Sequence, residues 1–104
     1  MTVFGMLRIT PVTEDDVTEE VAAAVEALEE HDVTYETNAM STVVEADDLD
    51  ALLAAVGDAH RAVPGDHVNT LLQIDDDRTT DVTGEEKVEK VESELGRDAK
   101  SDRE

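Results

Sequence analysis

The chain has 104 residues, the size of one ordinary domain, and its 28 acidic residues against eight lysines and arginines give a formal charge of −20. This charge excludes a basic face for nucleic acid and disfavours anionic membrane surfaces. No apolar run approaches the ~20 residues of a membrane span, no signal peptide is expected, and the absence of cysteine excludes disulfides and thiolate sites.

The acidic residues are spread along every segment and are not confined to a tail. At about 1 M salt the Debye length falls to ~3 Å, so a salt-rich cytoplasm would screen the repulsion between them. We therefore expect a halophilic, cytoplasmic protein in which most carboxylates are solvated surface groups. An acidic protein of an ordinary cytoplasm is the alternative.

The first two predicted elements are a strand over residues 3–10 and a helix. The strand is indicated by alternating side chains, and Pro11 ends it. Apolar residues at helical spacing over 17–28 then predict an amphipathic helix. Its capping residue is expected to be Thr13 or Asp15.

The next segment is rich in residues that favour strands. Residues 33–38 and 42–46 predict two strands, with a short connection at residues 39–41. A single long, bent strand is the alternative interpretation.

A second helix is predicted over residues 49–63, capped by Asp47 or Asp48. Pro64 and Gly65 mark its end. Its expected buried stripe consists of Leu49, Leu52, Leu53, Val56, His60 and Val63.

The C-terminal part begins with a predicted strand over residues 68–74. Thr83 followed by Glu86 three residues later is typical of a capping box, so a third helix is expected there, stopped by Gly96. Residues 97–104 are expected to form a polar tail.

The order strand, helix, strand, strand, helix, strand predicts an α+β, ferredoxin-like βαββαβ fold: an antiparallel sheet with helices on one face, plus a C-terminal helix, in one domain over residues 1–96. Alternation places Phe4, Met6 and Leu71 on the other face of the sheet. Three large apolar groups on the open face of an acid-coated protein indicate a contact surface for another subunit or a ligand.

Two motifs resemble the thiamine-binding protein family. They are residues 40–46, Met-Ser-Thr-Val-Val-Glu-Ala, and residues 73–78, Gln-Ile-Asp-Asp-Asp-Arg, and the resemblance covers about residues 3–95. It implies non-catalytic binding of thiamine or its hydroxymethylpyrimidine moiety, and a homodimer or homotetramer. Ser41 and Ala46 stand where the family has glycines, and Gln73 stands where it has lysine.

The resemblance also suggests which residues bind the ligand. Glu45 is expected to face the aminopyrimidine or the cationic ring, while Thr42 and Asn38 supply hydrogen bonds. Alternation puts Glu45 on the opposite face of its strand from Thr42. An apolar floor is expected from Met6, Phe4 or Met40.

Other functional classes have less support in the sequence. A ligand-free module for assembly or regulation remains the main alternative, and an enzyme acting on a thiamine precursor has no recognisable catalytic residues. No cofactor or metal is expected, because the calcium-like spacing after Asp75 has Thr80 where such a loop needs glycine. The resemblance instead suggests that Asp75 and Arg78 are structural or subunit-contact residues, and a pair between them at the strand end is expected to fix the turn into the last helix.

Overall fold

The computed structural model describes residues 2–103. Its elements follow the order β1 (Val3–Pro11), α1 (Thr18–Leu28), β2 (Thr34–Thr37), β3 (Thr42–Ala46), α2 (Leu49–Ala62), β4 (Val68–Asp75) and α3 (Gly84–Leu95). The four strands form one antiparallel sheet in the order β2-β3-β1-β4. This confirms the α+β, ferredoxin-like prediction, and β2 and β3 form a hairpin instead of one bent strand.

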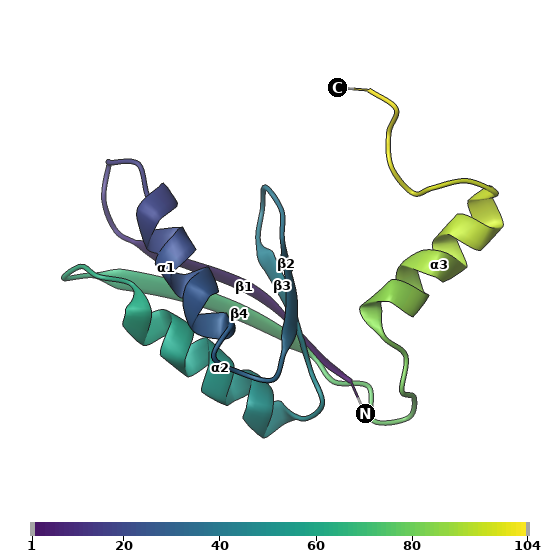
Figure 1. Ribbon diagram of the computed structural model, residues 1–104, viewed down its shortest axis with the longest axis horizontal. Helices are drawn as coiled ribbons and strands as arrows, with labels where there is room; N and C mark the ends of the chain where they lie inside the picture. The colour runs from purple at the N-terminus through teal and green to yellow at the C-terminus, as the bar shows by residue number, and fades with distance from the viewer. Residues whose placement is uncertain (1, 104) are drawn as a thin grey trace.

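Helices α1 and α2 lie side by side across one face of the sheet (Figure 1). A contact between the His31 ring and Asp58, 2.6 Å between Nε2 and Oδ2, joins the segment after α1 to α2. Hydrogen bonds from Arg61 and then His31 hold the pKa of Asp58 below its usual range. No helix in residues 2–103 is long and apolar enough to cross a membrane.

The core lies between the sheet and these two helices, and small residues dominate it. Its largest side chains below 2% exposure are Leu28, Leu52, Val3 and Val44. Gly5 allows α2 to approach β1, because a Cβ at this position would lie 3.0 Å from a Leu52 methyl carbon.

The helix boundaries confirm part of the capping predictions. Asp48 accepts a hydrogen bond from Ala51 N–H and caps α2, while Thr83 accepts one from Glu86 N–H and caps α3. The prediction that Thr13 or Asp15 caps α1 is wrong. That helix begins at Thr18, whose N–H donates to Asp16 at 2.8 Å.

Two members of the predicted stripe of α2 are exposed, and Leu49 is half-buried. Leu53 is 45% exposed, and His60 is an exposed residue whose ring contacts the Thr70 hydroxyl. Their expected places are taken by Ala55 and Ala59, both 0% exposed. Small side chains let the helix backbone lie close to the sheet, which leaves the larger groups at the helix margins.

Helix α3 extends away from the sheet and the other helices (Figure 1). Its start is held by Lys87, which lies 3.2 Å from Asp75 and 4.3 Å from the Phe4 ring centroid. The predicted pairing of Asp75 with Arg78 is therefore wrong, since Arg78 pairs with Asp76 instead, at 3.2 Å. Asp75 is the last residue of β4, and Lys87 in the first turns of α3 is the cation that reaches it.

Candidate functional site

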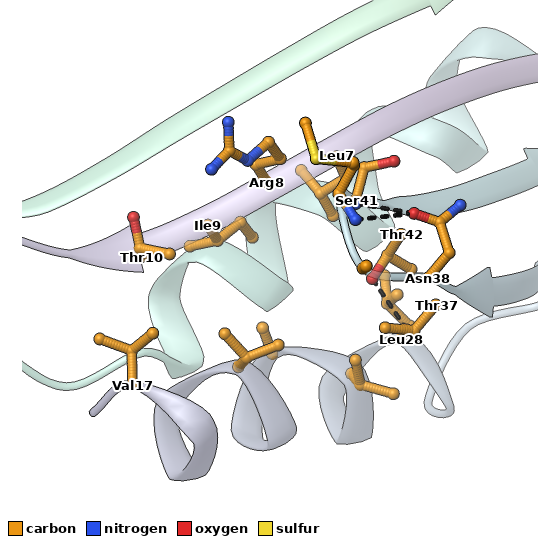
Figure 2. Close-up of a pocket in the computed structure, with 15 residues that line it drawn as sticks. Leu7, Arg8, Ile9, Thr10, Val17, Leu28, Thr37, Asn38, Ser41 and Thr42 are labelled. Atoms are coloured by element: carbon orange, nitrogen blue, oxygen red, sulfur yellow. Dashed lines mark hydrogen bonds between the residues drawn. The ribbon is translucent and has the colours of Figure 1, made fainter. Parts of the chain in front are cut away.

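A cavity of about 230 Å³ opens between α1, β1 and the turn that joins β2 to β3. Figure 2 shows β1 above it, α1 below it and the turn beside it. Its lining is largely apolar and includes Leu7 and Ile9 from β1 and Val17, Val21, Ala24, Val25 and Leu28 from α1 and its N-cap. The amphipathic stripe of α1 thus supplies one wall and the buried face of β1 another.

The turn that closes one side is organised by Asn38. Its side-chain oxygen accepts hydrogen bonds from Met40 N–H at 2.9 Å and Ser41 N–H at 3.0 Å (Figure 2). The main-chain N–H of Asn38 donates to the Ser41 carbonyl at 2.8 Å. These bonds fix the polar rim of the cavity before any ligand arrives, which lowers the entropy lost on binding.

Two hydroxyl groups lie together at this rim. Thr42 is 7% exposed, and its hydroxyl oxygen is 2.9 Å from that of Thr37 on the neighbouring strand. Each hydroxyl can both donate and accept, so the pair has hydrogen-bonding capacity left for a ligand.

The charge of the cavity differs from that of the rest of the surface. Arg8 is the one charged residue among those that line it, and no carboxylate does. Within residues 2–103 the Arg8 side chain makes no ion pair or hydrogen bond, and it extends from β1 on the side away from α1 (Figure 2). Two further cavities are lined by several carboxylates: one by Asp32, Glu45 and Asp47, and the other by Asp15, Asp16 and Glu20.

The predicted ligand residues fall on opposite faces of the sheet. Asn38, Met40 and Thr42 line the cavity under α1. Phe4 and Met6 lie on the open face with Glu45, as the cross-strand pair of Phe4 with Glu45 requires. One small ligand in the cavity therefore contacts Asn38, Met40 and Thr42. For Phe4, Met6 and Glu45 to bind a ligand, a second contact on the open face would be needed.

Glu45 is already engaged by the protein. Its carboxylate accepts a hydrogen bond of 2.7 Å from the N–H of Gly84, the first residue of α3. A Cβ at residue 84 would lie 2.6 Å from the same carboxylate, so a side chain at this position would make the Glu45 carboxylate shift. The arrangement stabilises the N-terminus of α3, where unpaired amides attract negative charge.

The prediction from the sequence missed Arg8, Ile9 and the wall supplied by α1. One signal was present: the first predicted strand is longer than the third, so its end extends past the hairpin. The replacement of family glycines by Ser41 and Ala46 causes no backbone strain, because the described residues other than glycine all have negative φ.

Comparison with known proteins supports the family resemblance that the two motifs indicated. The sequence profile described as "Thiamine-binding protein" matches residues 6–92. A UPF0045 protein of Methanothermobacter thermautotrophicus is 49% identical over 78 residues, covering 72% of this chain and 79% of that protein.

Solved structures agree with the fold. A hypothetical protein of Methanocaldococcus jannaschii has a TM-score of 0.79 and 34% identity, over 86% of this chain and 95% of that one. A putative thiamine biosynthesis/salvage protein of Thermotoga maritima has a TM-score of 0.75 and 24% identity, over 88% and 99% respectively, and supports the fold alone. On the match over most of its length, this chain belongs to the thiamine-binding protein family.

Proposed function

We propose that the protein binds thiamine, or its hydroxymethylpyrimidine moiety, reversibly and without chemical change. The observation that carries this proposal is that the family motif at Met40, Ser41 and Thr42 lines the cavity under α1. The description of the matching family, thiamine-binding protein, points to the same class of ligand.

The size and charge of the cavity favour the pyrimidine ring over the whole vitamin. Its volume of about 230 Å³ is below the ~300–1,000 Å³ typical of sites for larger ligands. The lining offers apolar walls for a neutral ring and hydroxyls at one rim. It offers no carboxylate to balance a thiazolium cation.

Calorimetric titration with the pyrimidine alcohol and with thiamine, in about 2 M KCl to screen surface charge, tests the proposal. We expect both to bind. Thr42→Val keeps the side-chain shape and removes one hydroxyl, so it should weaken binding by roughly 2–13-fold, the equivalent of ~0.5–1.5 kcal/mol. Thr34→Val, on the outward face of the same hairpin, is the matched control and should leave affinity unchanged.

Absence of heat and of any thermal shift at millimolar concentrations of both ligands would remove the proposal. If Thr42→Val and Thr34→Val weakened binding equally, the ligand would not be bound in the cavity under α1.

A ligand-free assembly module is the second candidate, and one observation favours it. Glu45, the residue expected to meet the cation, is hydrogen-bonded to the chain's own Gly84. In this alternative the open face and α3 serve only to join subunits, and the cavity under α1 binds nothing.

A homo-oligomer is compatible with both candidates, and we propose one. Val88, Val91 and Leu95 form an apolar stripe on α3 and are 51%, 53% and 46% exposed, while Met6 and Leu71 on the open face are 38% and 51% exposed. An isolated helix of this length is marginal in water, so a partner surface should cover it. A second copy offers apolar surface of the same kind, which two strongly negative chains can bury at high salt.

Sedimentation in about 2 M KCl should give a mass of two or four times the 11.3 kDa chain. Val91→Asp places a charge on the stripe and should shift the protein largely to monomer, because a buried unpaired charge is costly. Ser93→Asp adds the same charge to the opposite side of α3 and should leave the oligomer intact. A folded wild-type monomer at high concentration would refute the oligomer.

We further propose that this assembly works in a salt-rich cytoplasm. The charge of −20, spread over all elements, supports that setting.

A further inference from the structure

The cavity lies beside a stretch of β1 that has no neighbouring strand on one side. Pairing with β3 ends at Leu7 opposite Thr42, whereas pairing with β4 continues to Pro11 opposite Val68. The next residue of β1 whose main chain faces the β3 side is Ile9, which lines the cavity.

The direction of the Ile9 main chain follows from the hydrogen bonds on either side. Val12 N–H donates to the His67 carbonyl at 2.7 Å, so even-numbered residues of β1 exchange hydrogen bonds with β4. The main-chain N–H and C=O groups of odd-numbered residues point toward the β3 side. Pro11 is odd-numbered, so its lack of an N–H removes no hydrogen bond with β4. The N–H and C=O of Ile9 therefore point past the end of β3.

The pairing register would put Met40 opposite Ile9 if β3 continued. The turn prevents this, because Met40 N–H is already hydrogen-bonded to the Asn38 side chain. Among residues 2–103, no partner on the β3 side is found for the Ile9 main chain. Ile9 is only 5% exposed, and covered main-chain groups rarely stay without a partner.

We propose that the main chain of Ile9 is the element that selects the ligand, by pairing with the aminopyrimidine edge. This inference rests on the proposed function. The exocyclic amine of the ring donates to the Ile9 carbonyl, and the adjacent ring nitrogen accepts from the Ile9 N–H. The ring thus takes the place of the missing strand residue, and the apolar side chains of α1 cover its face.

The chemical class follows from this pairing. The site accepts a planar heterocycle with a donor beside an acceptor, and it discriminates against a ring that lacks the amine. Only about one residue of β1 is free in this way, which is too short an edge for strand addition by another chain.

Titration with the aminopyrimidine alcohol and with its analogue carrying hydrogen in place of the amine tests the inference. The analogue should bind at least about tenfold more weakly, because it leaves the carbonyl unpaired. In amide NMR spectra the Ile9 signal should shift and exchange more slowly when the amine ligand is added. The Leu7 amide, already paired with Thr42, serves as the internal control.

Equal affinity of the two rings, with an unchanged Ile9 amide, would overturn this inference and leave pyrimidine binding intact. Failure of the amine ligand to bind at all would overturn the inference and the proposed function together.

Discussion

Replacing Leu52 with alanine is expected to lower the free energy of unfolding by about 2–5 kcal/mol, the range for deleting a buried leucine side chain. Leu52 is 0% exposed and lies against the bare backbone of Gly5 on β1. The core is otherwise built largely from valine and alanine, so few large groups can move into the space. Because domains of this size are stable by only about 5–15 kcal/mol, the loss is a large share of the total.

Leu53→Ala is the matched control, since the neighbouring residue is 45% exposed. Leu53→Ala should lower the free energy of unfolding by well under half as much as Leu52→Ala. Urea unfolding in about 2 M KCl, followed by circular dichroism, measures both. Equal losses for the two variants would contradict the packing of α2 on the sheet.

Raising the salt concentration is expected to stabilise the protein strongly. Between about 0.1 M and 2 M KCl the Debye length falls from ~10 Å to below ~3 Å. Relief of roughly ten uncompensated like-charge pairs at ~0.3 kcal/mol each gives about 3 kcal/mol. For a domain of this size that corresponds to a rise in Tm of about 12–24 °C.

Scanning calorimetry across that range measures the effect, and a charge-reduced variant separates screening from general salting-out. Glu26→Gln, Glu30→Gln and Glu89→Gln together remove charges from exposed residues of this kind. The triple variant should be more stable at low salt and respond less to added salt. A Tm that changes little over the range, or an identical slope for the variant, would contradict the halophilic interpretation.

Local patterns predicted most of the fold because each has a short-range physical cause. Alternation along β1 assigned its two faces correctly, and the capping box at Thr83 located the start of α3. The start of α1 was missed because Thr13 and Asp15 are both suitable caps, and only the path of the chain over the sheet decides among such residues. Leu53 was misplaced because its burial depends on how closely α2 approaches the sheet.

The candidate site was less predictable, since it is made by segments that are distant in sequence. Asn38 and Thr42 were found because they belong to one hairpin, and the resemblance pointed to that hairpin. The wall from α1 and the free edge at Ile9 depend on strand register and on where β3 ends. Glu45 was assigned to the ligand on the family resemblance, and nothing local to it in the sequence reveals that Gly84 donates a hydrogen bond to its carboxylate.

The most direct test of the account is a crystal structure of the protein with the hydroxymethylpyrimidine bound at high salt. The account predicts density for the ring between α1 and the 38–41 turn, with its amine and ring nitrogen against the Ile9 main chain. A ring ordered instead on the open face, against Phe4, Met6 and Glu45, would contradict it.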